Sequence, residues 1–225
     1  MTSPGWLTRS LADVPTDDGW LGAREVDVLA GLRFEKRRAD WRLGRFASKA
    51  AVAIWLGVPP GRVEVAAAPD GAPEAWLDGR RAPASLSLSH RAGRALAVVG
   101  EADTALGCDL ELVEPRSQAF LNDWLAPSER GLPAAAGARR DIVANLLWTA
   151  KEAAAKARRE GLRLDVRQAV AELEGLSSTT PDWRRLAVVW GDGAGRAAGW
   201  WRAEPGWVMA IVGEPAPGPP RALGD

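Results

Sequence analysis

Apolar and polar positions along the chain predict two long helices and many short strands. Residues 22–56 carry apolar side chains at helical spacing, and the segment Gly57-Val58-Pro59-Pro60-Gly61 ends that helix. Residues 142–159 show the same spacing and predict the second long helix. Strict alternation from Ser85 to His90 predicts a strand with one polar face. The other predicted strands are 62–67, 74–77, 95–99, 106–113, 169–173, 186–190, 198–203 and 207–212, and the other predicted helices are 119–124 and 127–132.

Each half of the chain therefore combines a long helix with several short strands. No linker rich in Pro, Gly or Ser separates the halves, and no residue-level repeat is visible, so we expect any duplication to be structural only. The proline-rich segment 214–225 cannot pack regularly, and we expect it to be disordered.

Composition narrows the class of protein. The chain has 29 basic and 29 acidic residues among 225, so it offers no net field for nucleic acid or an anionic membrane. No stretch approaches 18 uninterrupted apolar residues, and residues 1–10 lack the apolar core of a signal peptide. Cys108 is the single cysteine, which excludes an internal disulfide and fits a reducing compartment. We expect a soluble cytoplasmic protein.

The segment Gly107-Cys108-Asp109-Leu110-Glu111 places two carboxylates on one strand face. Side chains two apart on a strand point the same way, so Asp109 and Glu111 share a face while Cys108 and Leu110 turn toward the core. Two like charges side by side favour a cation between them, and Mg²⁺ prefers such oxygen ligands. The alternative is a solvated strand edge whose acids discourage aggregation.

The predicted helix 142–159 adds a third acid and a lysine. Glu152 and Lys156 are four residues apart, which on an exposed helix is only a surface ion pair worth about 0.2–0.5 kcal/mol. Trp148, one turn earlier, would hold this face against the protein, and Ala153 to Ala155 leave room for another element. Three acids with a lysine beside them suggest a metal-assisted site that handles a phosphate ester.

Two further groups of residues could contact phosphate. His90 is the only histidine; a lone histidine usually has a structural role, but Ser87 and Ser89 share its strand and Arg91 follows. No nucleophile elbow of the G-x-S-x-G kind supports a serine hydrolase. A basic stripe on helix 22–56 is either a solvated face or a nucleotide-phosphate site. Its members are Arg38, Arg42, Arg45 and Lys49.

Four blocks in this order resemble the Sfp-type 4′-phosphopantetheinyl transferase family over roughly residues 35–175. They are the acidic strand 107–111, the helix Trp148 to Lys156, the strand end Ser87-Leu88-Ser89-His90, and the basic helix that runs from Arg37-Arg38-Ala39-Asp40-Trp41 through Gly44-Arg45 to Lys49. Three positions depart from the family pattern. Cys108 replaces Ile or Val, Arg91 stands where Ser or Thr is common, and Ala72 stands where Lys is common.

The resemblance implies an α+β pseudo-dimer of two similar halves with the active site in the cleft between them. Residues 1–102 would form the nucleotide-binding half and residues 103–213 the metal-binding, catalytic half. The reaction moves the 4′-phosphopantetheine arm of coenzyme A to a serine of an apo carrier protein and releases 3′,5′-adenosine diphosphate. The resemblance implies Mg²⁺, with Mn²⁺ as a substitute, and a monomer that serves acyl, polyketide or peptidyl carriers, the last two in secondary metabolism, with no nucleic-acid or membrane partner.

The resemblance also implies roles for individual residues. The metal ligands would be Asp109, Glu111 and Glu152, and the catalytic residues Glu152 (taking the serine proton), Lys156 (stabilising the leaving phosphate) and Asp109. The coenzyme would be held by Ser89, His90 and Lys156 at its phosphates, by Arg37, Arg38 and Arg45 at the nucleotide end, and by Gly71 beside the adenine. Two other readings of the same residues are a phosphate-binding module without transferase activity and a metal-dependent nucleotide phosphohydrolase.

Overall fold

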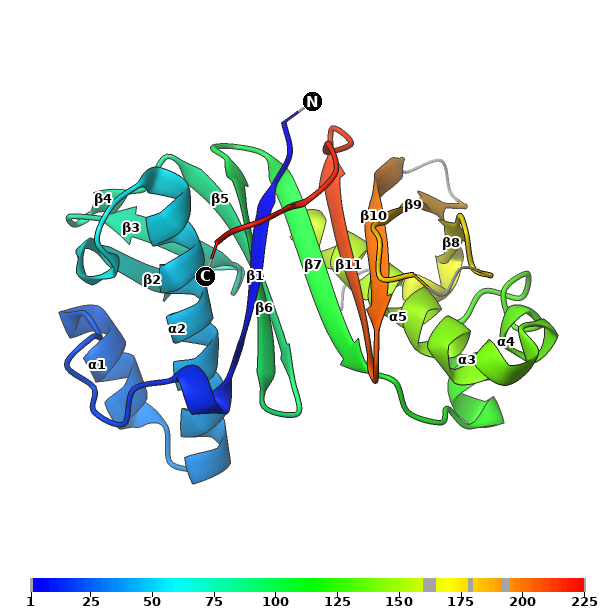
Figure 1. Cartoon of the computed structure of the whole chain (residues 1–225), viewed down its shortest axis with the longest axis horizontal. Helices are drawn as coiled ribbons and strands as arrows, with labels where there is room; N and C mark the ends of the chain where they lie inside the picture. Colours follow the sequence, from blue (N-terminus) through cyan, green and yellow to red (C-terminus); the bar gives the residue numbers. More distant parts are fainter. Residues whose placement is uncertain (1, 160–164, 178–179, 192–194, 225) are drawn as a thin grey trace.

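The computed structural model describes residues 2–159, 165–177, 180–191 and 195–224. Two α+β parts lie side by side, each with a long helix packed on a mainly antiparallel sheet (Figure 1). The α+β class implied by the family resemblance is therefore confirmed. Among the described residues, no helix is long and apolar enough to span a bilayer.

The N-terminal part is built around helix α2. Its strands are β1 (Gly5–Ser10), β2 (Val63–Ala67), β3 (Pro73–Leu77), β4 (Arg80–Arg81), β5 (Ala84–Arg91) and β6 (Arg94–Glu101), and its helices are α1 (Ala23–Gly31) and α2 (Glu35–Leu56). One sheet has the order β12-β1-β6-β5, in which β12 (Arg221–Ala222) comes from the end of the chain. A smaller sheet has the order β2-β3-β4. Residues of α2, including Leu43, Ala47 and Ala51, pack against both sheets in a continuous core.

The C-terminal part is built around helix α5. Its elements are β7 (Ala105–Leu112), α3 (Gln118–Trp124), α4 (Leu132–Ala135), α5 (Arg140–Ala157), β8 (Ala169–Leu173), β9 (Arg184–Trp190), β10 (Arg196–Glu204) and β11 (Trp207–Glu214). The sheet order is β7-β11-β10-β9-β8, and every pair is antiparallel. Helix α5 packs across this sheet and supplies the second core.

A third apolar cluster joins the two parts. Trp6, Leu96 and Val98 of the N-terminal sheet meet Cys108 and Leu110 of β7. The prediction that Cys108 and Leu110 face the core is confirmed, since both are buried. Burial raises the pKa of Cys108 to about 12, so the thiol stays protonated and acts as a small apolar side chain.

Serine hydroxyls on β5 bond directly to the segment around β7. The amide of Thr104 donates to Ser85 Oγ at 3.1 Å, and the amide of Cys108 donates to Ser87 Oγ at 2.9 Å. Ser89 Oγ donates to Asp109 Oδ1 at 2.7 Å. The alternation in Ser85–His90 therefore does create one polar face, and that face is used to join the two parts.

Gly107 allows β7 to lie directly against α5. A Cβ atom at this position would come within 1.9 Å of the carbonyl oxygen of Ala153 and 2.4 Å of the amide nitrogen of Ala157. The small side chains of α5 permit the same approach from the helix side, as the sequence predicted. This contact fixes the spacing between the acidic strand and the helix that carries Glu152 and Lys156.

Two predicted helices were wrong. Residues 22–56 form two helices, because the chain is extended at Leu32 and Phe34 and α1 folds back beside α2. The fold-back brings Glu25 of α1 to a buried lysine of α2. Residues 127–131 are turns, and α4 begins only at Leu132. The turn buries Glu129, which also pairs with a lysine.

The predicted disorder of the tail is also wrong. Arg221–Ala222 forms β12, which pairs in parallel with Gly5–Trp6 of β1. The amide of Leu223 donates to the Trp6 carbonyl at 2.8 Å, and its side chain joins the N-terminal core. Backbone pairing and one buried leucine are sufficient to order a segment whose prolines prevent regular structure on their own.

The lysine of the N-terminal part, Lys49, lies inside a closed set of polar contacts. Its Nζ pairs with Glu25 Oε2 at 2.7 Å and donates to the Trp20 carbonyl at 2.7 Å. Glu25 in turn accepts the amide of Gly22 at 2.9 Å and the amide of Val65 on β2 at 2.8 Å. Every charge is paired, which is what burial of an ion pair requires.

The same set recurs around Lys151 in the C-terminal part. Lys151 Nζ pairs with Glu129 Oε2 at 2.5 Å and donates to the Trp124 carbonyl at 3.3 Å. Glu129 accepts the amide of Ala126 at 2.8 Å and the amide of Ala171 on β8 at 2.6 Å. In both sets the glutamate follows the tryptophan by five residues. The expectation of no residue-level repeat was therefore wrong: Trp20-Leu21-Gly22 and Trp124-Leu125-Ala126 begin matching segments.

Candidate active site

A cavity of about 330 Å³ lies where the two parts meet. Asp70, Gly71, Glu74 and Ser87 line it from the N-terminal part, and Lys156 of α5 and Arg159, in the turn after α5, line it from the C-terminal part. Arg159 forms a bidentate pair with Asp70 at 2.8 and 2.9 Å, which links the parts across the cavity wall. Concave sites between packed units are where small-molecule ligands most often bind.

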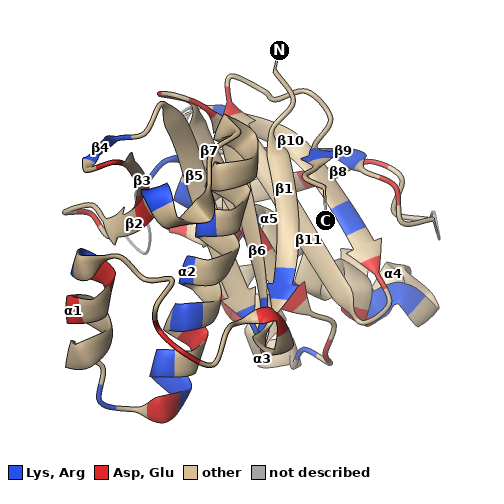
Figure 2. Cartoon of the chain, turned by 60° about the vertical axis from the view of Figure 1, so that its left-hand side comes forward, with Lys and Arg blue, Asp and Glu red and all other residues tan. Residues whose placement is uncertain are grey.

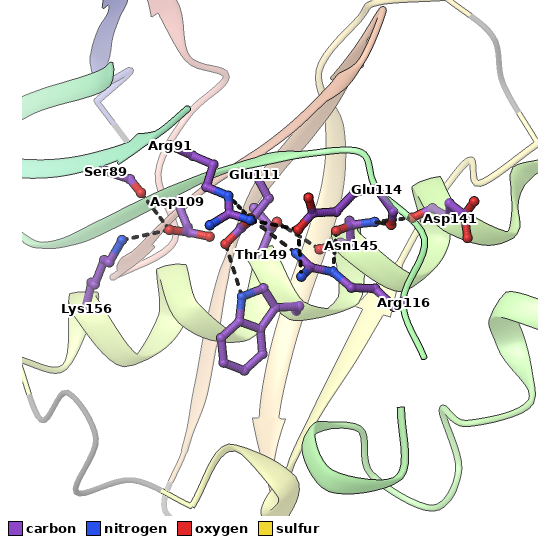
Figure 3. A network of polar contacts seen from close by, with 11 residues as sticks. Ser89, Arg91, Asp109, Glu111, Glu114, Arg116, Asp141, Asn145, Thr149 and Lys156 are labelled. Atoms are coloured by element: carbon purple, nitrogen blue, oxygen red, sulfur yellow. Dashed lines mark hydrogen bonds and ion pairs between the residues drawn. The ribbon is translucent and has the colours of Figure 1, made fainter. Parts of the chain in front are cut away.

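Asp109 lies beside this cavity and connects the two parts. Its side chain, 7% exposed, accepts from Lys156 Nζ at 2.7 Å and from Ser89 Oγ at 2.7 Å, both through Oδ1 (Figure 3). Its second oxygen, Oδ2, is buried and has no hydrogen-bond partner. A buried carboxylate oxygen without a partner is costly, so this atom is a candidate ligand for a cation.

Lys156 is a charged group at physiological pH. Partial burial would lower its pKa, but the adjacent Asp109 carboxylate more than compensates and raises that pKa above its usual value. Glu152, one turn earlier on α5, acts in the same direction. The site therefore holds a permanent positive charge beside the cavity.

The pKa of Glu152 is also raised, but here burial is the main cause. Burial raises its pKa, and the negative charges of Asp109 and Glu111 raise it further, while Lys156 lowers it. These couplings bring the two strand acids and the helix acid into one electrostatic group. A carboxylate with a raised pKa is a stronger base than an exposed one.

Glu111 is held by a ring of alternating charges. Its Oε2 contacts Arg91 Nε at 3.5 Å and Arg116 Nη2 at 3.2 Å, and both arginines also pair with Glu114. Its Oε1 accepts from Trp148 Nε1 at 3.3 Å, so Trp148 anchors this region as predicted (Figure 3). The pKa of Glu111 is raised, chiefly by burial and then by the Asp109 charge, although the two arginines act to lower it.

A preformed metal cage is not part of this geometry. Among the described residues, no group of three or more His, Cys, Asp or Glu side chains is arranged to hold an ion. The donor chemistry nevertheless fits a hard cation. Asp109 Oδ2 is buried without a partner, and the carboxylates of Glu111 and Glu152 repel the Asp109 carboxylate, a repulsion that a bound cation would relieve. The ligand set Asp109, Glu111 and Glu152 stays a prediction.

The predicted coenzyme residues fall into two places. Gly71 and Lys156 line the cavity. Arg37 and His90 line a second hollow of about 360 Å³, together with Lys36 and Trp41. Burial lowers the pKa of His90, so it is neutral at physiological pH.

The other predicted arginines have different surroundings. Arg38 donates to the carbonyls of Leu29 and Leu32, where it caps the end of α1. Arg45 stacks on Trp41 at 4.9 Å, and burial lowers its pKa. Lysines and arginines do follow α2 (Figure 2), but Arg42 and Lys49 of the predicted stripe bind segments of the protein itself. Roles for Arg38 and Arg45 in nucleotide binding stay predictions.

Sequence reasoning overlooked Glu114, Arg116 and Asn145. Arg116 Nε donates to Asn145 Oδ1 at 2.7 Å, and the amide group of Asn145 donates to the Glu114 carbonyl at 2.7 Å. A signal was present, because Asn145 lies three residues before Trp148 and so shares its helix face. A second signal was the pair of charged residues Glu114 and Arg116 just after the strand.

Comparison of the sequence with models of known protein families gives a match, which covers the acidic strand and helix α5. Residues 105–212 match the family model of the 4′-phosphopantetheinyl transferase superfamily, whose members use coenzyme A and typically a divalent metal. The resemblance based on four motifs is confirmed for this part of the chain, which contains Asp109, Glu111, Glu152 and Lys156. The predicted coenzyme residues before position 105 lie outside the match. No curated protein matches the chain.

Proposed function

We propose that this protein transfers the 4′-phosphopantetheine arm of coenzyme A to a serine hydroxyl of an apo carrier protein. The observation that carries the proposal is the Asp109–Lys156 pair at the cavity wall, with Glu111 and Glu152 beside it, inside the segment that matches the superfamily. In this reaction a bond forms between the serine oxygen and the phosphorus next to the pantetheine arm. The pyrophosphate P–O bond breaks, and 3′,5′-adenosine diphosphate leaves.

The corresponding contacts of the buried lysines Lys49 and Lys151 support a pseudo-dimer. If residues 1–102 and 103–213 descend from one duplicated unit, Lys49 corresponds to Lys151, and Ala50 and Ile54 stand in the places of Glu152 and Lys156. The N-terminal copy then lacks both the acid and the lysine. One chain would hold one active site, which favours a monomer that binds coenzyme A in the cleft between its halves.

Glu152 and Lys156 suit complementary tasks. With its raised pKa, Glu152 is the best-placed base to take the proton of the attacking serine, directly or through water. Lys156 is protonated and faces the cavity, where it would stabilise the charge that develops on the departing phosphate. Both groups lie one turn apart on a rigid helix that Gly107 holds against β7, which gives the positioning that such a reaction needs.

We propose that a divalent cation binds beside these residues. Asp109, Glu111 and Glu152 would hold Mg²⁺, or Mn²⁺ in its place, and the bound ion would neutralise charge on the pyrophosphate. Asp109 Oδ2 is the natural first ligand because it is buried and has no other partner.

The N-terminal part would bind the nucleotide. Gly71 lies in the cavity wall, while Arg37 and His90 share the second hollow and would contact phosphate. Ser89, which donates to Asp109 beside the first cavity, would also contact a phosphate of the coenzyme. Arg38 and Arg45 remain candidates for the 3′-phosphate. We propose acyl, polyketide or peptidyl carriers as acceptors, the last two in secondary metabolism.

The test is intact-mass analysis of several apo carriers incubated with the protein, coenzyme A and Mg²⁺. We expect a mass increase equal to one phosphopantetheine group on the carrier serine, and none with Asp109→Asn. Arg62→Ala, which breaks an exposed ion pair with Asp78, should leave the transfer intact. Failure to modify any carrier would contradict the proposal. Loss of coenzyme A without a carrier would instead support a phosphohydrolase.

A further inference from the structure

Arg116 is unusually well held for a charged side chain next to an active site. Its guanidinium reaches three acceptors in different directions: Nε to Asn145 Oδ1 at 2.7 Å, Nη1 to Glu114 Oε1 at 3.0 Å, and Nη2 to Glu111 Oε2 at 3.2 Å. It also stacks on Phe120 at 4.7 Å, and its side chain is 14% exposed.

The residue that anchors Arg116 is itself fixed. Asn145 is buried in α5, and its amide group donates to the carbonyls of Glu114 and Asp141 at 2.7 Å each. The orientation of that amide is set by these two carbonyls, so its oxygen must face Arg116. Helix α5 therefore determines where the guanidinium lies, and the guanidinium determines where Glu111 Oε2 lies.

Glu111 is consequently restrained from two sides. Oε2 contacts the two arginines, and Oε1 accepts from Trp148 Nε1. Asp109, two residues earlier on β7, lies beside Glu111 (Figure 3). An arginine suits three such contacts because its planar fork spreads the donors over three nitrogens, whereas the three donors of a lysine share one nitrogen. Arg91 contributes less, since it is 3.5 Å from Glu111 and about half exposed.

We propose that Arg116, anchored by Asn145, is a positioning residue that holds Glu111 in the orientation required for binding the divalent cation. The inference rests on the proposed function, because Glu111 is a cation ligand only if the site works as described there. Partners that orient a metal ligand commonly change metal affinity by about 10–100-fold when they are removed.

The experiment measures Mn²⁺ binding by electron paramagnetic resonance, in the full-length protein without coenzyme A. We expect Arg116→Ala to weaken Mn²⁺ binding at least tenfold, and Arg116→Lys to weaken it measurably although the charge is kept. Coenzyme A affinity in EDTA should not change, since Arg116 does not line the cavity. The matched control is Arg140→Ala: Arg140 contacts the Arg116 carbonyl and pairs with Asp141 but does not touch Glu111.

Each outcome is decisive. Wild-type Mn²⁺ affinity in folded Arg116→Ala overturns the inference and leaves the proposed function standing. If Arg116→Ala does not fold, Arg116→Lys decides in the same way. If the wild-type protein itself binds no Mn²⁺ and modifies no carrier, the proposed function fails and this inference fails with it. An equal loss of affinity in Arg140→Ala would show a general effect on the helix and also overturn the inference.

Discussion

Arginine and tryptophan side chains stack throughout this protein. The chain has twelve tryptophans and no tyrosine, and most of the indole rings have a cation above them. Arg158 lies 4.5 Å from the ring of Trp190, and Arg185 lies 4.9 Å from that of Trp200. Each exposed contact contributes about 0.5–1 kcal/mol. This abundance of tryptophan has a structural explanation and needs no separate function.

Replacing Glu152 by glutamine tests the role of the carboxylate as a base. We expect kcat to fall by about 10²–10⁴, the usual contribution of a general base. The loss should be largest where the wild-type carboxylate is ionised and able to accept a proton. Rates measured between pH 4 and 9 give the result. The control is Glu172→Gln on β8, whose carboxylate is 55% exposed and pairs with Arg196.

The same variant should be more stable without metal. A raised pKa means that Glu152 contributes stability below its unfolded pKa and loses that contribution as the pH rises through its folded pKa. At pH 7 the glutamine variant is free of this unfavourable charge, so its Tm in EDTA should exceed that of the wild type, with the difference vanishing near pH 4. A lower Tm at pH 7 would contradict this view of the site.

At the scale of elements, the site depends on the contact between β7 and α5. These two elements carry all three acids and Lys156, and only a glycine at position 107 lets their backbones approach closely enough. The buried pairs of Lys49 and Lys151 also join elements. In each pair the lysine lies on a long helix, and its glutamate partner accepts a backbone amide from a strand. The alternation and helical spacing in the sequence were sufficient to place both elements of the site.

Replacing Gly107 by alanine should separate β7 from α5. The added Cβ would overlap backbone atoms of Ala153 and Ala157, which cannot move as a side chain end can. We expect destabilisation of about 1–3 kcal/mol or more, which in a domain of this size lowers Tm by about 2–4 °C per kcal/mol. Gly100→Ala on β6 is the control, because its Cβ would have ordinary contact at 3.5 Å. Equal Tm values for the two variants would refute the argument.

At the scale of the whole molecule, the tail closes the fold. After β11 the chain leaves the C-terminal part and returns to pair β12 with β1, so the last strand of the chain belongs to the first sheet (Figure 1). Together with the serine contacts from β5 and the apolar cluster around Cys108, it holds the two parts in one arrangement. The cavity between the parts depends on that arrangement.

Replacing Leu223 by alanine tests this role of the tail. Leu223 is 8% exposed and fills the core beside Gly5. Truncation of a buried leucine usually costs about 2–5 kcal/mol, here near the lower end because the residue lies at a chain end. Tm should fall accordingly, while Leu132→Ala, at a position 39% exposed, should have little effect. An unchanged Tm would mean that the tail is not held in place.

Local patterns along the sequence determined much of this protein. Alternation placed Asp109 and Glu111 on one strand face, helical spacing placed Glu152 and Lys156 on one helix face, and both hold in the structure because they depend only on backbone geometry. Tertiary structure decided what depends on distant partners. It split the helix at 32–34, turned 127–131 away from helix, ordered the tail and brought Arg116 to Glu111. Burial of paired charges and backbone pairing between remote segments outweigh local preference, and no local pattern records them.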